Sequence, residues 1–419
     1  MKVLVSAYAC SPGRGSEAGA GWHSALQIVR FHEVWVLTRP CNEAAISTAL
    51  AQQPLANAHW VYFDLPRWAR WWNRQDRGIH FHYYLWQVGA YFVGRRLHRQ
   101  VRFDLAHHVT HGCYWMPSFL ALLPVPFVWG PVGGGESTPR GFWGSLSLYG
   151  KVYEIMRSIA QWIGRRDPFV RLTAWRAGIG MASTEGTEAR LRELGCRETM
   201  VFPTGLPECD RLRLGGIPFR QGSPFRACSV GNLLHLKGCE LGLRAFAEAQ
   251  LEVASSEYWI VGDGPERKRL EVLSGELGVA ANVMFWGMIP REQALERLAA
   301  CDVLLHPSLH DSNPTACLEA MAAGRPVICL DLSGPALQVT GDTGIKVPAL
   351  TPKQAVTGLA SAMVRLARDP ALRERMGRAA QCRVEEHYSS DKKGKTWAAI
   401  YERVVRERHP STREASHWD

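Results

Sequence analysis

Short apolar segments alternate with amphipathic segments along nearly the whole chain. This alternation constrains the fold most, because strands separated by helices pair in parallel in sheets that are covered by helices on both faces. In the first half, the expected strands are 2–8, 33–38, 60–63, 103–109, 126–129, 178–182 and 200–202. In the second half, they are 226–231, 258–261, 283–286, 303–306 and 326–330, with helices at 239–249, 266–277, 291–300 and 314–323. The pattern predicts an α/β protein with two parallel sheets.

Length supports two domains, because single hydrophobic cores stop growing near 250–300 residues and this chain has 419. Residues 203–224 are rich in proline and glycine and lack periodicity, so we place the hinge there. We expect an N-terminal domain at 1–205, a C-terminal domain at 206–391, a helix at 392–410 that can cross back to the first domain, and a disordered tail at 411–419. Trp397, Ile400, Tyr401 and Val404 give that helix one apolar face.

Composition is that of a globular protein, with 46% apolar and 21% charged residues. No segment reaches the roughly 20 apolar residues of a membrane span, and the N-terminus reads as a buried strand, so we expect a cytoplasmic protein. Eleven cysteines are scattered singly and are expected to be reduced. The formal charge of +10 suits phosphates, an anionic membrane surface or nucleic acid, or reflects arginine-rich coding alone.

The most informative segment is 305–321, LHPSLHDSNPTACLEAM. Asn313 suits an N-cap and Pro314 a first helical position, so a helix is predicted to begin at the end of a strand. Its free N–H groups, with Thr315 in the first turn, suit a diphosphate. Asp311 before the helix and Glu319 within it are candidate ligand-binding carboxylates. Alternatively, Asp311 assists capping and Glu319 pairs with an arginine.

These residues resemble the retaining family-4 glycosyltransferases of GT-B fold, of the bacterial group 1 type. The resemblance covers the second half through SVGN with Lys237-Gly238, VGDGP at 261–265, FWGMIP at 285–290, and Asp311 with Glu319, which are separated by seven other residues. It implies two Rossmann-like domains facing a cleft, and a metal-independent transfer without a cofactor. The sugar would move from a UDP- or GDP-linked donor to a glycan, lipid-linked or small-molecule acceptor.

Carried over to this chain, the resemblance assigns donor-binding and catalytic roles. Lys237 would hold the diphosphate, Asp311 the donor sugar and Glu319 the ribose hydroxyls. The remaining donor-binding candidates are Gly15, Gly231, Asn232, Gly262, Gly264, Trp286, Gly287, Asn313, Pro314 and Thr315. Two departures stand out: Asn232 replaces the usual arginine, and DSNP at 311–314 replaces glutamate followed by Gly-Phe-Gly.

A glycine loop follows the first strand. Residues 13–18 match G-x-G-x-x-A, so a dinucleotide site is an alternative, although no acidic residue follows the second strand and only Arg39 could face a 2′-phosphate. In the resembled family such a loop meets donor or acceptor, with Glu17 on the acceptor side. His108 or His111, near the end of a later strand, would face the donor sugar. Zinc is disfavoured there because alternation places His107 and His108 on opposite faces.

Residues 66–102 mix tryptophan, tyrosine and arginine. This mixture suits the headgroup region of an anionic bilayer, where a lipid-linked acceptor would lie, so the protein could be peripheral on the inner face of the membrane. Packing against the first domain is an equal alternative, and nucleic acid is not an expected partner.

The function predicted from sequence is a glycosyltransferase of polysaccharide biosynthesis. Two alternatives remain open: a GT-B nucleotide-sugar epimerase, and a catalytically weak protein that binds sugar nucleotides or membranes.

Overall fold

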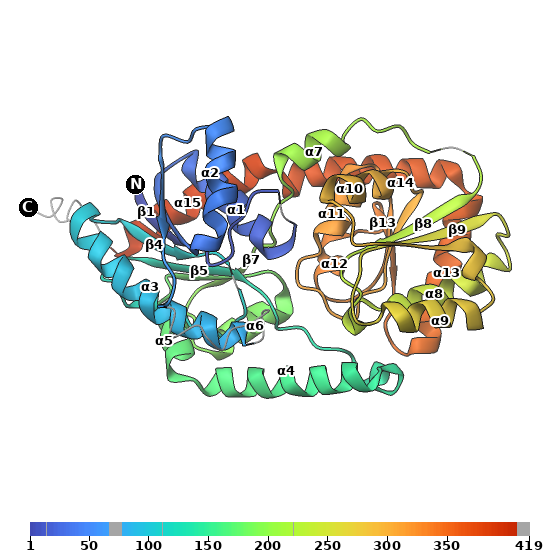
Figure 1. The fold of residues 1–419 in the computed structure, drawn as a ribbon, viewed down its shortest axis with the longest axis horizontal. Coiled ribbons are helices and arrows are strands. Elements are labelled where there is room, and N and C mark those ends of the chain that lie inside the picture. The colour runs from blue at the N-terminus through green and yellow to red at the C-terminus, as the bar shows by residue number, and fades with distance from the viewer. Residues whose placement is uncertain (14, 67–77, 111, 221, 409–419) are drawn as a thin grey trace, which may run out of the picture. The chain divides into compact units, whose positions relative to one another are not determined.

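The computed structural model describes residues 1–13, 15–66, 78–110, 112–220 and 222–408. The chain forms two compact units, each built on its own parallel sheet (Figure 1). The first unit contains Met1–Gly135, Ile159–Thr204 and the described residues from Asp391 on, and the second contains Glu136–Ser158 and Gly205–Ser390. Neither unit is therefore a single stretch of sequence.

The first unit contains a sheet of seven strands in the order β3-β2-β1-β4-β5-β6-β7, all parallel. Its core consists largely of valine, leucine and isoleucine on strands that are buried on both faces. The strands are β1 (Lys2–Ser6), β2 (Glu33–Thr38), β3 (Ala58–Tyr62), β4 (Leu105–His108), β5 (Phe127–Val132), β6 (Ile179–Ala182) and β7 (Thr199–Val201). The helices are α1 (Ser16–Val29), α2 (Glu43–Gln52), α3 (Ile79–Val101), α5 (Pro168–Arg176), α6 (Glu185–Glu193) and α15 (Ser390–Arg408).

Helix α15 completes the core of the first unit. Trp397, Ile400, Tyr401 and Val404 are all buried against the sheet, as their spacing predicts. The Tyr401 hydroxyl hydrogen-bonds to His107 of β4, and the Trp397 ring lies 4.5 Å from the His107 ring between centroids. A helix from the end of the sequence thus covers part of the sheet that contains the first strand.

The second unit contains six parallel strands in the order β10-β9-β8-β11-β12-β13. The strands are β8 (Phe225–Val230), β9 (Ser256–Val261), β10 (Val283–Gly287), β11 (Val303–His306), β12 (Val327–Leu330) and β13 (Gly344–Val347). Five of these follow the predicted strands closely, whereas β13 was not predicted, because its GIKV segment is short and half exposed at the sheet edge. The helices are α7 (Glu208–Leu214), α8 (Cys239–Gln250), α9 (Arg267–Glu276), α10 (Arg291–Ala299), α11 (Thr315–Ala322), α12 (Ser333–Gln338), α13 (Pro352–Arg368) and α14 (Pro370–Arg383).

Two segments differ from the sequence-based expectation. The proline-rich stretch 203–224 contains helix α7, whose Leu214 is buried in the core of the second unit. Residues 136–158, which a boundary at 205 assigns to the first domain, belong to the second unit. They do so because Phe142 and Leu146 pack in its core. Helix α4 (Leu148–Arg166) starts in that segment.

Two segments with sequence-based expectations fall wholly or partly outside the described residues. The tail 411–419 lies outside the described residues, as does much of the aromatic stretch after residue 66. Among the helices that are described, none combines the length and the apolar character needed to cross a bilayer.

Replacement of Trp397 by alanine should destabilise the first unit. Removing a fully buried tryptophan leaves a cavity, so we expect a loss of about 3–5 kcal/mol in the free energy of unfolding, measured by urea denaturation. Lys395→Ala on the same helix is the control. Lys395 makes an exposed ion pair with Asp391, and its loss should cost less than about 1 kcal/mol. Equal losses in the two variants would contradict the packing role of α15.

Candidate functional site

The candidate site lies at the topological switch point of the second sheet. Strand β8 leads to β9 on one side, and β11 lies on its other side, so the loops after β8 and β11 diverge at the carboxyl edge. Open α/β sheets bind ligands at this point. The loop after β8 carries Gly231 and Lys237, and the loop after β11 carries Asp311. The sequence-predicted donor residues therefore converge on one edge.

Glycines line the ends of three neighbouring strands. Gly231, Gly262 and Gly287 follow or end β8, β9 and β10, and have φ angles of 144°, 132° and 69°. A Cβ on Gly262 would lie 2.0 Å from the Gly231 carbonyl oxygen, so only glycine fits there. Gly264 likewise lies against the backbone of Leu233. Gly262 and Gly264 therefore let the loops after β8 and β9 pack closely, backbone against backbone.

Lys237 and Asp311 form an ion pair that joins the two diverging loops. His306 Nε2 lies 3.3 Å from an Asp311 carboxylate oxygen. Burial alone would raise the pKa of Asp311, but the Lys237 ammonium and the His306 imidazole hold it well below its usual range. Burial lowers the pKa of His306. Asp311 is therefore a carboxylate at neutral pH, with a largely uncharged histidine beside it.

Glu319 is buried in α11 and pairs with Arg291 at the start of α10, with 2.6 Å between Nη2 and Oε1. Arg291 also bonds to Asp210 of α7 at 2.6 Å. Burial raises the pKa of Glu319, and the arginine offsets this in part. The pairing anticipated as an alternative for Glu319 is thus present, and it leaves Oε2 as the carboxylate oxygen outside that contact.

Helix α11 begins one residue later than predicted. Its first helical residue is Thr315 and its N-cap position is Pro314, so Asn313 does not cap it. The Asn313 carboxamide oxygen instead accepts a bond of 3.4 Å from Gln338. Proline fixes the backbone before the helix without a side-chain cap. The first amides of α11 are consequently left without the side-chain acceptor that was predicted for them.

The charged residues of the site lie close enough to act on one thiol. Burial raises the pKa of Cys317 in α11, Asp311 and Glu319 raise it further, and Lys237 opposes them.

A small pocket between the loops is lined by Gly231, Asn232, Lys237, His306 and Pro307, among others. Asn232 is exposed beside it. Trp286 instead packs beside Trp259, with the Arg297 guanidinium 4.0 Å from its ring centroid.

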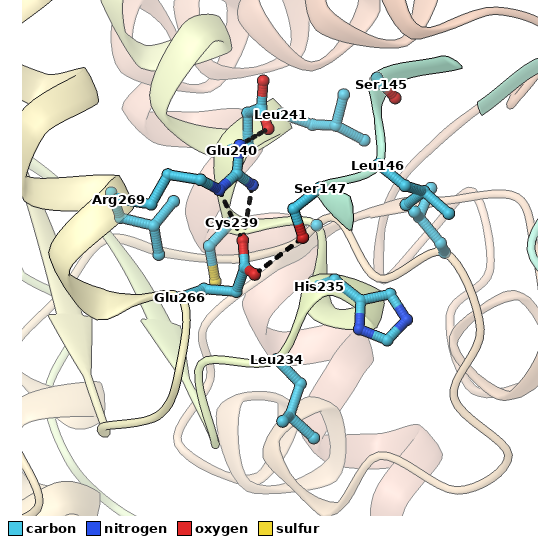
Figure 2. A pocket seen from close by; sticks show the side chains of 13 residues that line it. Ser145, Leu146, Ser147, Leu234, His235, Cys239, Glu240, Leu241, Glu266 and Arg269 are labelled. Atoms are coloured by element: carbon cyan, nitrogen blue, oxygen red, sulfur yellow. Dashed lines mark hydrogen bonds and ion pairs between the residues drawn. The ribbon is translucent and has the colours of Figure 1, made fainter. Parts of the chain in front are cut away.

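A second pocket lies behind the loop after β8 (Figure 2). Glu266 lies between Ser147 and Arg269 there, accepting bonds of 3.1 Å and 2.7 Å. Arg269 also reaches Glu240 of α8, and His235 lines the same pocket. The charge of Arg269 is thus already balanced by two carboxylates, so this pocket is a weaker anion site than the loop that carries Lys237.

In the first unit, the corresponding switch point lies between β1 and β4. Glu17 of α1 accepts a bond of 2.9 Å from the Gly112 amide, which connects the loops after these strands. Gly15 is exposed immediately before α1. His108 is buried, with Nε2 3.1 Å from the Tyr83 hydroxyl, whereas His107 contacts α15, so the two histidines point to opposite faces as predicted. His111 lies outside the described residues.

Several residues of the site were not predicted. Arg291 and Asp210 complete the contacts of Glu319, and His306 completes those of Asp311. Arg291 follows Pro290 at a helix start, where a surface role is the usual one, so spacing gave no signal. His306 was visible as a polar residue ending an apolar strand. Glu154, His235 and His310 form a buried group with potential metal-ligand atoms within 4.8 Å of one another, the one such group in the described part of the chain.

The second unit resembles known glycosyltransferases in sequence. Residues 217–383 match the family model of glycosyl transferases group 1. We name residues 217–383 the group 1 domain after the model that they match. A lipopolysaccharide core biosynthesis glycosyltransferase of Rhizobium meliloti is 32% identical over 167 residues, which is 40% of this chain and 47% of that protein. A 2-deoxystreptamine glucosyltransferase of Streptomyces kanamyceticus is 31% identical over 224 residues, 52% of this chain and 56% of that one.

The group 1 domain belongs to a chain of GT-B fold. The crystal structure of Anabaena Alr3699/HepE in complex with UDP and glucose superposes with a TM-score of 0.63, at 17% identity over 96% of this chain and 100% of that one. This likeness shows the fold in both units. The chain spans about half the length of the curated relatives it matches, so the sequence likeness rests on the group 1 domain.

Replacement of Arg291 by methionine should leave Glu319 buried without its cation. We expect a loss of about 3 kcal/mol in the free energy of unfolding at pH 7. Because the pKa of Glu319 is already raised and would rise further, the carboxyl protonates as pH falls, and the loss should be smaller at pH 5. Urea denaturation at both pH values measures it.

Two further variants control this experiment. Addition of Glu319→Gln to Arg291→Met should recover part of the loss, because the buried charge is removed. Arg213→Met breaks exposed pairs with Glu292 and Glu296 and should cost less than about 1 kcal/mol. A loss in Arg291→Met that grows as pH falls would show that the buried charge of Glu319 is not its cause.

Proposed function

We propose that this protein is a hexosyltransferase that moves a sugar from a nucleoside diphosphate sugar to an acceptor, with the donor bound by the group 1 domain. The observation that carries the proposal is the Lys237–Asp311 ion pair at the switch point, beside glycine-lined strand ends and the start of α11. A cation and free backbone amides at one sheet edge suit a diphosphate.

The proposed reaction places charge where these residues can stabilise it. As the bond between the anomeric carbon and the diphosphate oxygen breaks, negative charge grows on the leaving group, and Lys237 with the first amides of α11 would stabilise it. Asp311 holds the Lys237 side chain in place before the donor arrives. When the diphosphate binds, it competes for the same ammonium, which frees Asp311 to accept bonds from sugar hydroxyls.

The nucleoside is proposed to lie toward Glu319. Its Oε2 can accept bonds from ribose hydroxyls while Arg291 holds Oε1. A neutral Asn232 beside the pocket contributes hydrogen bonding and no charge, so Lys237 carries most of the electrostatic attraction for the diphosphate. UDP is the nucleotide in the similar Anabaena structure, and we propose a UDP- or GDP-linked donor here.

We propose that transfer retains the anomeric configuration and proceeds without a metal or cofactor. On this course the acceptor oxygen attacks from the face that the diphosphate leaves, and the proton of the acceptor hydroxyl passes to a diphosphate oxygen. One C–O bond breaks and one forms, so no protein nucleophile is required. The cations of the chain supply the charge that a metal would otherwise provide.

The acceptor is proposed to be a glycan or a lipid-linked molecule, met by the first unit near Glu17. Support for a lipid surface comes from α4 rather than from residues 66–102. Leu148, Val152, Ile155, Ile159 and Trp162 recur every three or four residues on α4, and each is about half exposed or more. The helix has four basic residues and one acidic residue. An amphipathic, cationic helix of this kind suits an anionic bilayer surface.

The donor site can be tested by the thermal shift that UDP, GDP, ADP and their sugars cause. At a ligand concentration near 100 Kd, binding to the folded form should raise Tm by about 5 °C for the correct nucleotide. Lys237→Ala should abolish this shift. Lys346→Ala removes another lysine of the same unit that pairs with an aspartate, and should keep it. Absence of any shift in the parent protein would contradict the proposal.

Turnover separates the proposal from the alternative functions. Release of the nucleoside diphosphate that depends on an added acceptor indicates a transferase. Interconversion of the donor without an acceptor would indicate an epimerase, and binding without turnover over a broad acceptor panel would indicate a binding protein.

The membrane surface can be tested by sedimentation with phosphatidylglycerol vesicles. The parent protein should sediment with them, and the double variant Ile159→Asp/Trp162→Asp should bind about tenfold more weakly, because two apolar contacts are lost and two negative charges are added. Leu251→Asp is the control, since Leu251 is 88% exposed but lies outside α4. Equal binding of the double variant, or self-association through α4 in place of vesicle binding, would contradict a lipid-binding role.

A further inference from the structure

One buried carboxylate contacts both loops that carry the donor-site charges. Oε1 of Glu154, on α4, lies 3.0 Å from Nε2 of His235 and 2.8 Å from Nε2 of His310. All three side chains are at least nine-tenths buried. Glu154 precedes His235 by 81 residues and His310 by 156, so the cluster joins three distant segments of the chain.

Each histidine stands next to a residue of the donor site. His235 begins the 3-10 turn His235–Lys237, whose last residue is Lys237. His310 immediately precedes Asp311 in the loop after β11. A single oxygen therefore sets the positions of two loops whose next charged residues form the Lys237–Asp311 pair. A shift of Glu154 would be passed to both partners of that pair.

The two loops also touch each other through their backbones. The Leu309 amide donates to the Leu236 carbonyl at 2.8 Å, and the Ser308 hydroxyl donates to the same oxygen at 2.9 Å. These bonds set the spacing between the loops, but not their position relative to the rest of the unit. Segment 136–158 fixes both loops to another element of the unit through Glu154, and it also contacts them through Ser312 and Glu136, 2.6 Å apart.

Hydrogen bonds account for the cluster better than a metal does. His235 Nδ1 is buried and has no hydrogen-bond partner. If Nε2 carries the proton toward Glu154, Nδ1 is only an unused acceptor. A metal on Nε2 would move the proton to Nδ1 and leave a buried N–H donor without an acceptor, whereas histidine ligands almost always donate that N–H to a second group.

The ionisation of Glu154 agrees with this arrangement. Burial would raise its pKa, but the hydrogen bonds from His235 and His310 lower it to about 2. The folded pKa lies below the unfolded one, so the stabilisation is present above pH 4.5 and is lost as pH falls toward 2. Glu154 is thus a carboxylate throughout the neutral range, and it accepts both bonds under working conditions.

We infer that Glu154 is the positioning residue of the donor site, holding the Lys237 and Asp311 loops in place through two N–H···O bonds to one oxygen, without a metal. This inference rests on the proposed function only in taking those loops as the diphosphate site. It assigns a specific task to α4, an element outside the group 1 match. Glu154 does not touch the substrate and acts through its two histidines.

The test compares Glu154→Ala and Glu154→Gln with a matched control. Alanine removes the acceptor, whereas the glutamine carbonyl retains an accepting oxygen without the charge. Asp302→Asn is the control, because Asp302 is equally buried in the same unit and pairs with Arg220 at 2.7 Å, but it lies before β11 at the opposite edge of the sheet. The variants are compared in the full-length protein after their stabilities have been measured.

Two measurements are made on each protein. Hydrogen exchange should be at least tenfold faster at residues 234–238 and 307–313 in Glu154→Ala, with a smaller change in Glu154→Gln and none there in Asp302→Asn. Calorimetric titration with UDP, GDP and ADP should give a Kd about tenfold weaker in Glu154→Ala for whichever nucleotide the parent binds, an intermediate value in Glu154→Gln, and the parent value in Asp302→Asn.

The outcomes separate this inference from the proposed function. A parent protein that binds none of the three nucleotides would count against the diphosphate site, and hydrogen exchange would still decide the role of Glu154. Parent-like exchange in both loops of Glu154→Ala would overturn the inference. An equal loss of affinity in Asp302→Asn, in proportion to its loss of stability, would also overturn it. So would one equivalent of zinc bound to the parent protein and absent from Glu154→Gln.

Discussion

The ion pair between Lys237 and Asp311 is the interaction on which the candidate site depends. It joins the loops that diverge from β8 and β11, and it orients a lysine side chain at the carboxyl edge of the sheet. A partly buried cation with a paired anion costs less to maintain than an isolated one. Asp311 therefore balances the charge of Lys237 until an anionic ligand competes for the lysine.

The carboxylates near this pair are bound by donors other than Lys237. Glu319 is held by Arg291, Glu266 by Arg269, and Glu154 by two histidines. Each of these three carboxylates is thus paired with a donor other than Lys237. Such separation matters in a site of low dielectric, where an unsatisfied charge nearby would shift the ionisation of the working groups.

Much of the group 1 domain could be predicted from sequence, because its strands are continuous apolar runs and its glycines and Lys237 stand in a recognisable order. Local signals also explain the correct apolar face of α15. They fail where long-range packing decides. The contacts of Glu319 with Arg291 and Asp210 link residues from three helices, and no spacing rule reports them. Asn313 looked like an N-cap, but the proline after it took the cap position, so the helix began one residue later.

The division of the chain could not be predicted for the same reason. Proline and glycine predicted a boundary at residues 203–224. Nothing in the sequence around Phe142 and Leu146 predicts that they pack in the core of the second unit. Only the tertiary packing shows that α4 starts among the donor loops. Motifs therefore named the candidate donor residues and gave no sign of segment 136–158, which contacts the loops that carry Lys237 and Asp311.

The interleaving of the two units has a consequence for biosynthesis. Segment 136–158 leaves the ribosome before any strand of the second sheet exists, and α15, which covers the first sheet, is made only after that sheet is complete. Neither core can therefore close in the order in which its residues are translated. The apolar residues of segment 136–158 are made before their partners, and the part of the first sheet that α15 covers stays exposed until the last helix is made.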